Sequence, residues 1–170
     1  MVIRVMGVDP GSYRMGYGLV EEGASLTATA WGTIEAKKSL PVEARLSHIY
    51  TEMTQLLDRW QPQEVAVEDP FVGANHRSIL ALGQAQGVVL LAAAQRKLPV
   101  SRYSPAQVKR AVADYGGATK ERLEELVRIA LRLDTPIESN DAADALAVAL
   151  CHLYQRRLAQ VLARQASPGA

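Results

Sequence analysis

Residues 2–20 have the sequence VIRVMGVDPGSYRMGYGLV, which predicts two strands joined by a tight turn. The part up to residue 8 is apolar and β-branched, and Asp9-Pro10-Gly11-Ser12 then interrupts it with residues typical of a turn. Residues 13–20 read as the second of these strands, and residues 26–34 read as a third. Three strands with short connections form an antiparallel meander, so the chain is expected to begin with a sheet.

Beyond residue 40 the pattern of apolar residues changes from strand to helix. Between Pro41 and Trp60, apolar residues recur at spacings of three and four, which predicts an amphipathic helix. A short β-rich segment at 65–67 and another at 99–103 enclose a second predicted helix at about 78–97. The sequence therefore predicts an α/β fold with a mixed five-stranded sheet flanked by helices.

Three further helices are predicted by their start signals. Ser104 precedes a proline and has a glutamine three residues after it, which is a capping box. Thr119 is expected to cap a helix that ends near Leu133, and a last helix is expected to start at Ser139 or Asn140. We expect one domain over residues 1–160 and a flexible tail at 161–170.

The bulk composition is that of an ordinary globular domain. The chain has 170 residues, of which 48% are apolar and 22% charged. Cys151 is the single cysteine, so no internal disulfide is possible, and a buried thiol is expected. No segment approaches the ~18 apolar residues of a membrane span, and the N-terminus does not resemble a secretion signal. No membrane association and a cytoplasmic location are therefore expected.

Charge is distributed unevenly along the chain, although the net charge is only +1. Residues 70–113 contain no Asp or Glu, and neither does the part after Leu150. The first of these segments contains Arg77, Arg96, Lys97, Arg102, Lys109 and Arg110. Basic regions set against an acidic cluster are compatible with nucleic-acid binding, and equally with solvated helix faces.

Four acidic residues lie within or directly after apolar runs: Asp9, Glu68, Asp141 and Asp144. Carboxylates rarely occupy such positions unless their charge is compensated. Asp144 is the only polar side chain between Ala142 and Cys151, and it lies one helical turn after Asp141. Asp141 could also simply complement the helix N-terminus.

A shared divalent cation is the simplest compensation for these four carboxylates. Mg²⁺ and Mn²⁺ prefer oxygen ligands, and two such ions can activate water and stabilise the leaving oxygen of a phosphodiester. Glu68 stays in phase with its strand, whereas Asp69 should point to the opposite side and be a solvated loop acid. The pattern predicts a metal site formed by Asp9, Glu68, Asp141 and Asp144.

Several motifs in this order resemble the RuvC family of Holliday junction resolvases. They are Gly7-Val8-Asp9-Pro10-Gly11-Ser12, Gly16-Tyr17-Gly18, Ala66-Val67-Glu68, Leu82-Gly83-Gln84-Ala85-Gln86-Gly87, Pro105 to Lys109, Gly116 to Lys120, and Asp141-Ala142-Ala143-Asp144-Ala145-Leu146-Ala147. The resemblance covers about residues 2–155. It implies an RNase H-like fold, a homodimer, a four-way DNA junction as substrate, a branch-migration complex as partner, and divalent-metal endonuclease activity.

The resemblance also implies roles for individual residues. Asp9, Glu68, Asp141 and Asp144 match the family's catalytic carboxylates, and Lys109 and Lys120 match its functional lysines. Phe71 matches its junction-contacting aromatic residue, and the loop at 71–77 ends in Arg77, a further candidate DNA contact. The mechanism expected is paired nicking of opposing strands with two Mg²⁺ or Mn²⁺ ions, with Lys120 as an additional catalytic residue.

Two details depart from the family pattern, and several readings stay open. The Asp69-Pro70 pair adds a carboxylate that could change metal preference, and His152 is expected to be structural.

The helix at 75–97 could form the dimer surface or pack in the core. The competing functions are an actin-like ATPase, for which 170 residues leave no second domain, a related nuclease on another nucleic acid, and a non-catalytic junction-binding module.

Overall fold

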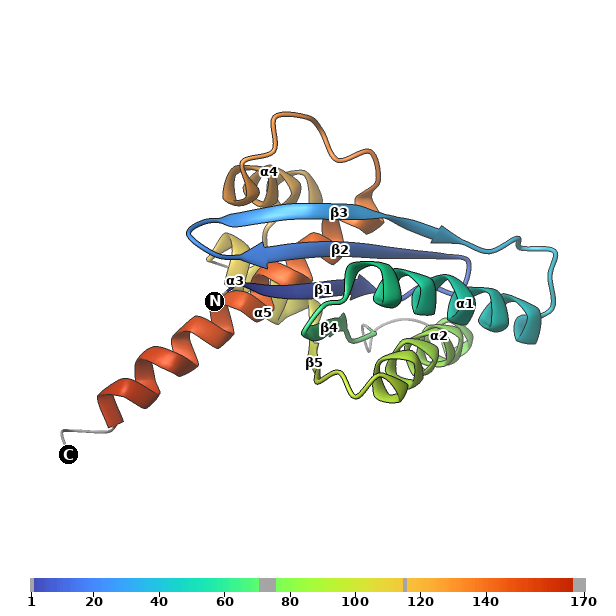
Figure 1. The fold of residues 1–170 in the computed structure, drawn as a ribbon. Helices are drawn as coiled ribbons and strands as arrows, with labels where there is room; N and C mark the ends of the chain where they lie inside the picture. The colour runs from blue at the N-terminus through green and yellow to red at the C-terminus, as the bar shows by residue number, and fades with distance from the viewer. Residues whose placement is uncertain (1, 71–75, 115, 167–170) are drawn as a thin grey trace.

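The computed structural model describes residues 2–70, 76–114 and 116–166 (Figure 1). Its elements are β1 (Ile3–Asp9), β2 (Arg14–Glu22), β3 (Leu26–Glu35), α1 (Val42–Trp60), β4 (Glu64–Glu68), α2 (His76–Gln95), β5 (Val100–Tyr103), α3 (Pro105–Ala113), α4 (Lys120–Leu131) and α5 (Asn140–Ala166). No helix within these residues is both long enough and apolar enough to span a bilayer.

The five strands form one mixed sheet in the order β3-β2-β1-β4-β5. β1, β2 and β3 pair antiparallel as a meander, while β1 pairs parallel with β4 and β4 pairs parallel with β5. The prediction of a mixed five-stranded sheet with flanking helices is confirmed. The parallel pairing places the carboxyl ends of β1 and β4 side by side, which is where Asp9 and Glu68 lie.

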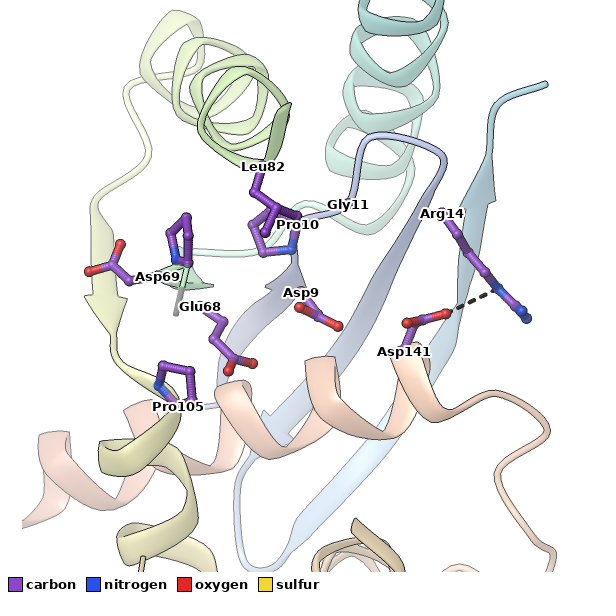
Figure 2. Close-up of a pocket in the computed structure, with 10 residues that line it drawn as sticks. Asp9, Pro10, Gly11, Arg14, Glu68, Asp69, Leu82, Pro105 and Asp141 are labelled. Atoms are coloured by element: carbon purple, nitrogen blue, oxygen red, sulfur yellow. Dashed lines mark ion pairs between the residues drawn. The ribbon is translucent and has the colours of Figure 1, made fainter. Parts of the chain in front are cut away.

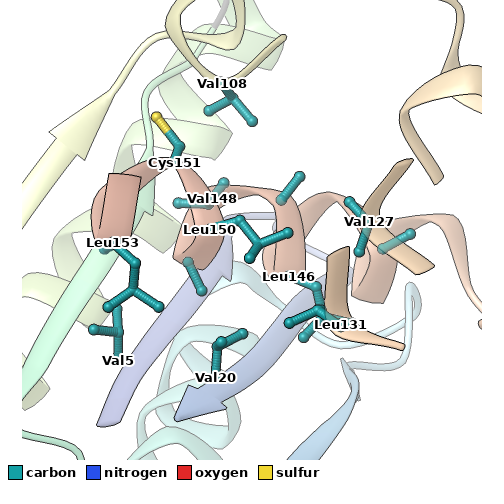
Figure 3. Close-up of a cluster of buried hydrophobic side chains, with 14 of the residues drawn as sticks. Val5, Val20, Val108, Val127, Leu131, Leu146, Val148, Leu150, Cys151 and Leu153 are labelled. Atoms are coloured by element: carbon teal, nitrogen blue, oxygen red, sulfur yellow. The ribbon is translucent and has the colours of Figure 1, made fainter. Parts of the chain in front are cut away.

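Helices cover both faces of the sheet, and strand alternation decides which side chain faces which layer. Val5 of β1 packs in the core with α3, α4 and α5, whereas its neighbour Met6 packs with α1 and α2. Figure 3 shows the first of these cores, with Leu153 of α5 beside Val5 and Leu146 of α5 beside Leu131. Both faces of the sheet are thus apolar, but they pack against different helices.

The helices α3, α4 and α5 begin at the start signals that the sequence predicted. Ser104 and Gln107 form the predicted capping box, and the Thr119 hydroxyl accepts a hydrogen bond from the backbone N–H of Arg122. α5 begins at Asn140, as expected, and continues to Ala166. The predicted boundary at residue 160 therefore falls inside a helix, whose last turns extend away from the sheet in Figure 1.

α5 carries a partly buried polar network against β4 and β5. His152 bridges two strands, because its Nδ1 lies 2.8 Å from the Tyr103 hydroxyl and its Nε2 lies 2.6 Å from a Glu64 carboxylate oxygen. Arg156 completes the network with an Nε–O distance of 3.1 Å to Glu64. His152 thus ties α5 to β4 and β5. The neighbouring Cys151 is a buried free thiol, and burial raises its pKa to about 12.

Candidate active site

Strand phase places Asp9 and Glu68 on the same side of the sheet. Residues 5 and 7 of β1 face α5, so Asp9, two residues further, faces α5 as well. Ala66 of β4 also packs on the α5 side, and Glu68 continues that alternation. The two carboxylates end adjacent parallel strands, so both point into the space between the sheet and the start of α5 (Figure 2).

Glycines in β1 and β2 let the backbone of α5 lie directly against the sheet. A Cβ added at Gly7 would lie 2.0 Å from the carbonyl oxygen of Ala145, and one added at Gly16 would lie 1.9 Å from that of Asp141. Any larger residue would push the helix away. This close approach brings Asp141 and Asp144, one turn apart on α5, to the strand ends that carry Asp9 and Glu68.

Two adjoining cavities bring together the charged residues predicted from the sequence. One, of about 330 Å³, is lined by Asp9, Glu68 and Asp141, and the other, of about 270 Å³, by Asp9, Glu68 and Asp144 together with Lys109 and Lys120. Asp9 and Glu68 line both cavities and are therefore at the centre of the site. Four carboxylates from three elements converge there with two lysines.

Burial and mutual repulsion perturb the central carboxylates. Desolvation is the largest cause that raises the pKa of Asp9 to about 8, and the charges of Glu68, Asp144 and Asp141 raise it further. Desolvation and Asp144 raise the pKa of Glu68 to about 7. The pKa of Asp144 is also raised, again mainly by burial, although Lys120 opposes the shift. The site therefore holds more negative charge than the protein itself compensates.

Two cations offset part of this charge. Lys120 Nζ lies 3.3 Å from Asp144 Oδ2, and the pKa of Lys120 is raised, mainly by that carboxylate. Arg14 Nε lies 3.1 Å from Asp141 Oδ2, and the ion pair is drawn in Figure 2. Sequence analysis missed Arg14. Its position at the start of β2, across the turn from Asp9, could have indicated it, because both residues lie at the same edge of the sheet.

The donor set fits a divalent cation. Within the described part of the chain, no three His, Cys, Asp or Glu side chains already form a group that could hold a metal ion. Arg14 and Lys120 hold the carboxylates of α5, and the like charges of Asp9 and Glu68 repel each other. All four acids nevertheless offer the hard oxygen ligands that Mg²⁺ and Mn²⁺ prefer, beside an open cavity.

Arg14→Gln is expected to tighten Mn²⁺ binding about 3- to 10-fold, because it removes a cation that competes for Asp141. Isothermal titration of the DNA-free protein measures this directly. Arg122→Gln is the matched control, since Arg122 is as exposed as Arg14 and its partner Glu125, 2.7 Å away, lines neither cavity. Equal Mn²⁺ affinity in both variants and the parent would contradict the competition.

Asp69 is on the opposite side of the strand from Glu68, as predicted, but it is not a solvated loop acid. It pairs with Arg102 and accepts a hydrogen bond of 2.8 Å from Gln86 Nε2 of α2. In Figure 2 its carboxylate points away from that of Glu68. The prediction of a solvated acid was wrong because strand phase directs Asp69 into α2 and β5 rather than into water.

The structure describes the position of only one of the two remaining candidate DNA contacts. Phe71 lies outside the described residues. Arg77 is in the first turn of α2, the helix whose Leu82 lines the cavity of Asp9 and Glu68. Both stay predictions.

Comparison with known proteins identifies relatives over nearly the whole chain. Residues 5–152 match the family model described as crossover junction endodeoxyribonuclease RuvC. A curated protein of that name from Thermomicrobium roseum is 48% identical over 94% of this chain and 98% of its own length. Another from Dehalococcoides mccartyi is 44% identical, over 95% of this chain and 98% of its own length.

A solved structure confirms the fold. Thermus thermophilus RuvC in complex with a Holliday junction substrate superimposes with a TM-score of 0.87 at 34% identity, covering 92% of this chain and 96% of that one. The fold is therefore RNase H-like, as the motifs implied. A family model over residues 5–152, relatives that match 94–95% of the chain and four carboxylates in one site agree, and the chain belongs to the RuvC family of crossover junction endodeoxyribonucleases.

Proposed function

We propose that this protein is a structure-specific endodeoxyribonuclease that resolves four-way DNA junctions in recombination and repair. The observation that carries the proposal is the site itself, in which Asp9, Glu68, Asp141 and Asp144 surround open cavities with Lys109 and Lys120. The relative from T. thermophilus was solved with a junction bound, which supports the same substrate class here.

The four carboxylates are proposed to hold Mg²⁺ or Mn²⁺. When bound, such ions supply Lewis-acid activation of water and of the phosphate oxygens. Because Asp9 and Glu68 line both cavities, and Asp141 and Asp144 line one each, Asp9 and Glu68 would hold both of two ions, and Asp141 and Asp144 would hold one each. The raised pKa values of Asp9 and Glu68 support this, since a cation would relieve the repulsion that raises them.

The lysines are proposed to act on the phosphate rather than on the ions. Lys120 is 66% exposed while it pairs with Asp144, so its ammonium can turn toward a phosphate placed in the cavity. There it would stabilise the negative charge that develops during hydrolysis. Lys109 lines the same cavity from α3 and would add to this effect.

The expected reaction is paired nicking of opposing strands by a homodimer. A junction has approximate two-fold symmetry, so a two-fold dimer can place equivalent sites on two strands. α2 supports this role, because Leu80 and Leu91 are 64% and 52% exposed while Ala85 and Val89 of the same helix are buried in the core. Phe71 and Arg77 are proposed as further junction contacts, and a branch-migration complex as a partner.

The function is tested by incubating the protein with a synthetic mobile junction labelled on all four strands. With Mg²⁺ or Mn²⁺ we expect two nicks at symmetric positions, and none with EDTA. Linear duplex and RNA–DNA hybrid serve as competitors. Equal cleavage of duplex or hybrid would favour a nuclease with another substrate, and tight binding without cleavage would favour a non-catalytic module.

Leu80→Glu is expected to shift a dimer to monomer at micromolar concentration and to uncouple the two nicks. A charge placed on an exposed apolar residue at an interface must be desolvated when the subunits associate. Sedimentation and supercoiled-cruciform cleavage measure the two effects. Ile129→Glu on α4 is the matched control, because Ile129 is also 64% exposed. If both variants sediment like the parent, α2 is not the dimer surface.

A further inference from the structure

A second groove continues from the active site toward the loop after β3. It has a volume of about 600 Å³ and shares Gly11, Arg14, Leu82 and Asp141 with the cavity of Asp9 and Glu68. Its additional walls include Tyr13 from the turn after β1 and Lys38 from the loop after β3. A strand that leaves the catalytic carboxylates therefore has an open path along the start of β2 and the end of β3.

An aromatic ring and two cations are assembled at the far end of this groove. The Tyr13 side chain is on the surface, and the Arg45 guanidinium lies 4.4 Å and Lys38 Nζ 5.8 Å from the centre of its ring. The backbone fixes this arrangement, since Ala36 N–H donates to the Tyr13 carbonyl at 2.8 Å. Arg45 also donates from Nη1 to the Leu40 carbonyl at 2.6 Å. The Arg45 guanidinium is thus held in place before any ligand arrives.

The end of this groove beside Tyr13 carries cations, whereas the end that it shares with the active site carries Asp141. Neither Lys38 nor Arg45 forms an ion pair with any residue that the structure describes, and Lys37 beside them is exposed. The acid that lines the groove near them, Glu35, pairs with Arg14 at 3.4 Å. Uncompensated cations next to an exposed ring suit a phosphodiester backbone with an adjacent sugar or base.

We propose that this groove, which is lined by Tyr13, Arg14 and Lys38 and has Arg45 against the Tyr13 ring, binds the DNA strand that flanks the scissile phosphate. Lys38 and Arg45 neutralise a phosphate next to the cleaved one, and Tyr13 packs against its nucleoside. Arg14, at the boundary between the two cavities, contacts the backbone between them. The inference rests on the proposed function, because it presupposes a DNA strand in the active site.

The test compares Lys38→Glu with Arg59→Glu, both in an Asp9→Asn background so that binding is measured without cleavage. Arg59 is a close match: it is exposed, lies 5.0 Å from the centre of the Trp60 ring, and is at the other end of α1. Both substitutions change the net charge equally, so any long-range electrostatic effect is common to the two. Junction affinity is measured by fluorescence anisotropy over a salt series.

Lys38→Glu is expected to weaken junction binding about 10-fold relative to Arg59→Glu and to reduce the slope of log K against log salt by about 1, the value for one lost phosphate contact. Tyr13→Ala is expected to weaken binding about 5-fold without changing the slope, because it removes stacking and no charge. Thermal melting of each variant checks that the fold is kept.

The outcomes separate this inference from the proposed function. If the Asp9→Asn protein binds the junction and Lys38→Glu behaves like Arg59→Glu, the groove does not contact DNA and the inference is overturned. A groove that instead receives a protein partner gives that same result. If the Asp9→Asn protein itself shows no preference for a junction over linear duplex, the proposed function fails first.

Discussion

Asp9→Asn is expected to lower the rate of junction cleavage by about 10³-fold or more, and at the same time to stabilise the metal-free protein at alkaline pH. The loss of rate follows because Asp9 lines both cavities, so its carboxylate is proposed to serve every ion in the site. The gain in stability follows because the amide removes a buried charge that three other carboxylates repel. Cleavage kinetics and urea unfolding in EDTA measure the two effects.

The pH dependence of this gain has a definite sign. The pKa of Asp9 is raised from 3.8 to about 8, so between these values the folded state binds more protons than the unfolded state. The free energy of unfolding contributed by this group therefore falls as pH rises from about 4 to about 8. Asn does not titrate, and its advantage over Asp should grow across this window to about 1–3 kcal/mol.

A control and a metal titration complete this test. Asp134→Asn replaces an exposed acid outside both cavities and should show no such pH-dependent gain. Mg²⁺ should raise the melting temperature of the parent at pH 8 but not that of Asp9→Asn, since ligand binding to the folded state stabilises it. A parent protein whose stability rises steadily from pH 5 to pH 8 in EDTA would contradict the raised pKa of Asp9.

Gly16→Ala is expected to cost about 2–4 kcal/mol of stability and to slow cleavage about 10²-fold. Its Cβ would lie 1.9 Å from the Asp141 carbonyl oxygen and 2.4 Å from the Asp141 carbonyl carbon. Both are backbone atoms, so α5 must move by more than 1 Å at the residue that carries a proposed metal ligand. Denaturant unfolding and single-turnover cleavage measure the two losses.

Gly23→Ala is the matched control for this prediction. Gly23 lies in the connection between β2 and β3, and the nearest atom to its added Cβ is the tip of Val2 at 3.5 Å, an ordinary contact. This substitution should leave both stability and cleavage close to the parent. If Gly16→Ala also left them unchanged, α5 would not lie directly on the sheet as described.

Local patterns sufficed to predict most elements of the fold. The capping box at Ser104, the Thr119 cap and the start of α5 near Asn140 all depend on short-range hydrogen bonding, and each was predicted correctly. The helix at residues 41–60 followed from its apolar spacing and is α1. Such features depend on neighbours in the chain, which is why the sequence alone determines them.

Contacts between distant segments could not be predicted in the same way. Arg14 reaches Asp141 across 127 positions of sequence, and Asp69 is held by Gln86 and Arg102 from two other elements. No local pattern encodes these pairings, because they depend on how α5 and α2 are placed on the sheet. Sequence analysis therefore missed Arg14 and assigned Asp69 to solvent.

The sequence by itself determined which residues are proposed to carry the chemistry: four carboxylates in apolar surroundings, in the order and with the motifs of the RuvC family. Tertiary structure decided how they meet. Strand alternation turns Asp9 and Glu68 toward α5, and the lack of a side chain at Gly7 and Gly16 lets the helix backbone approach within contact distance. The site and the groove beside it depend on packing, because their charged groups come from elements far apart in the chain.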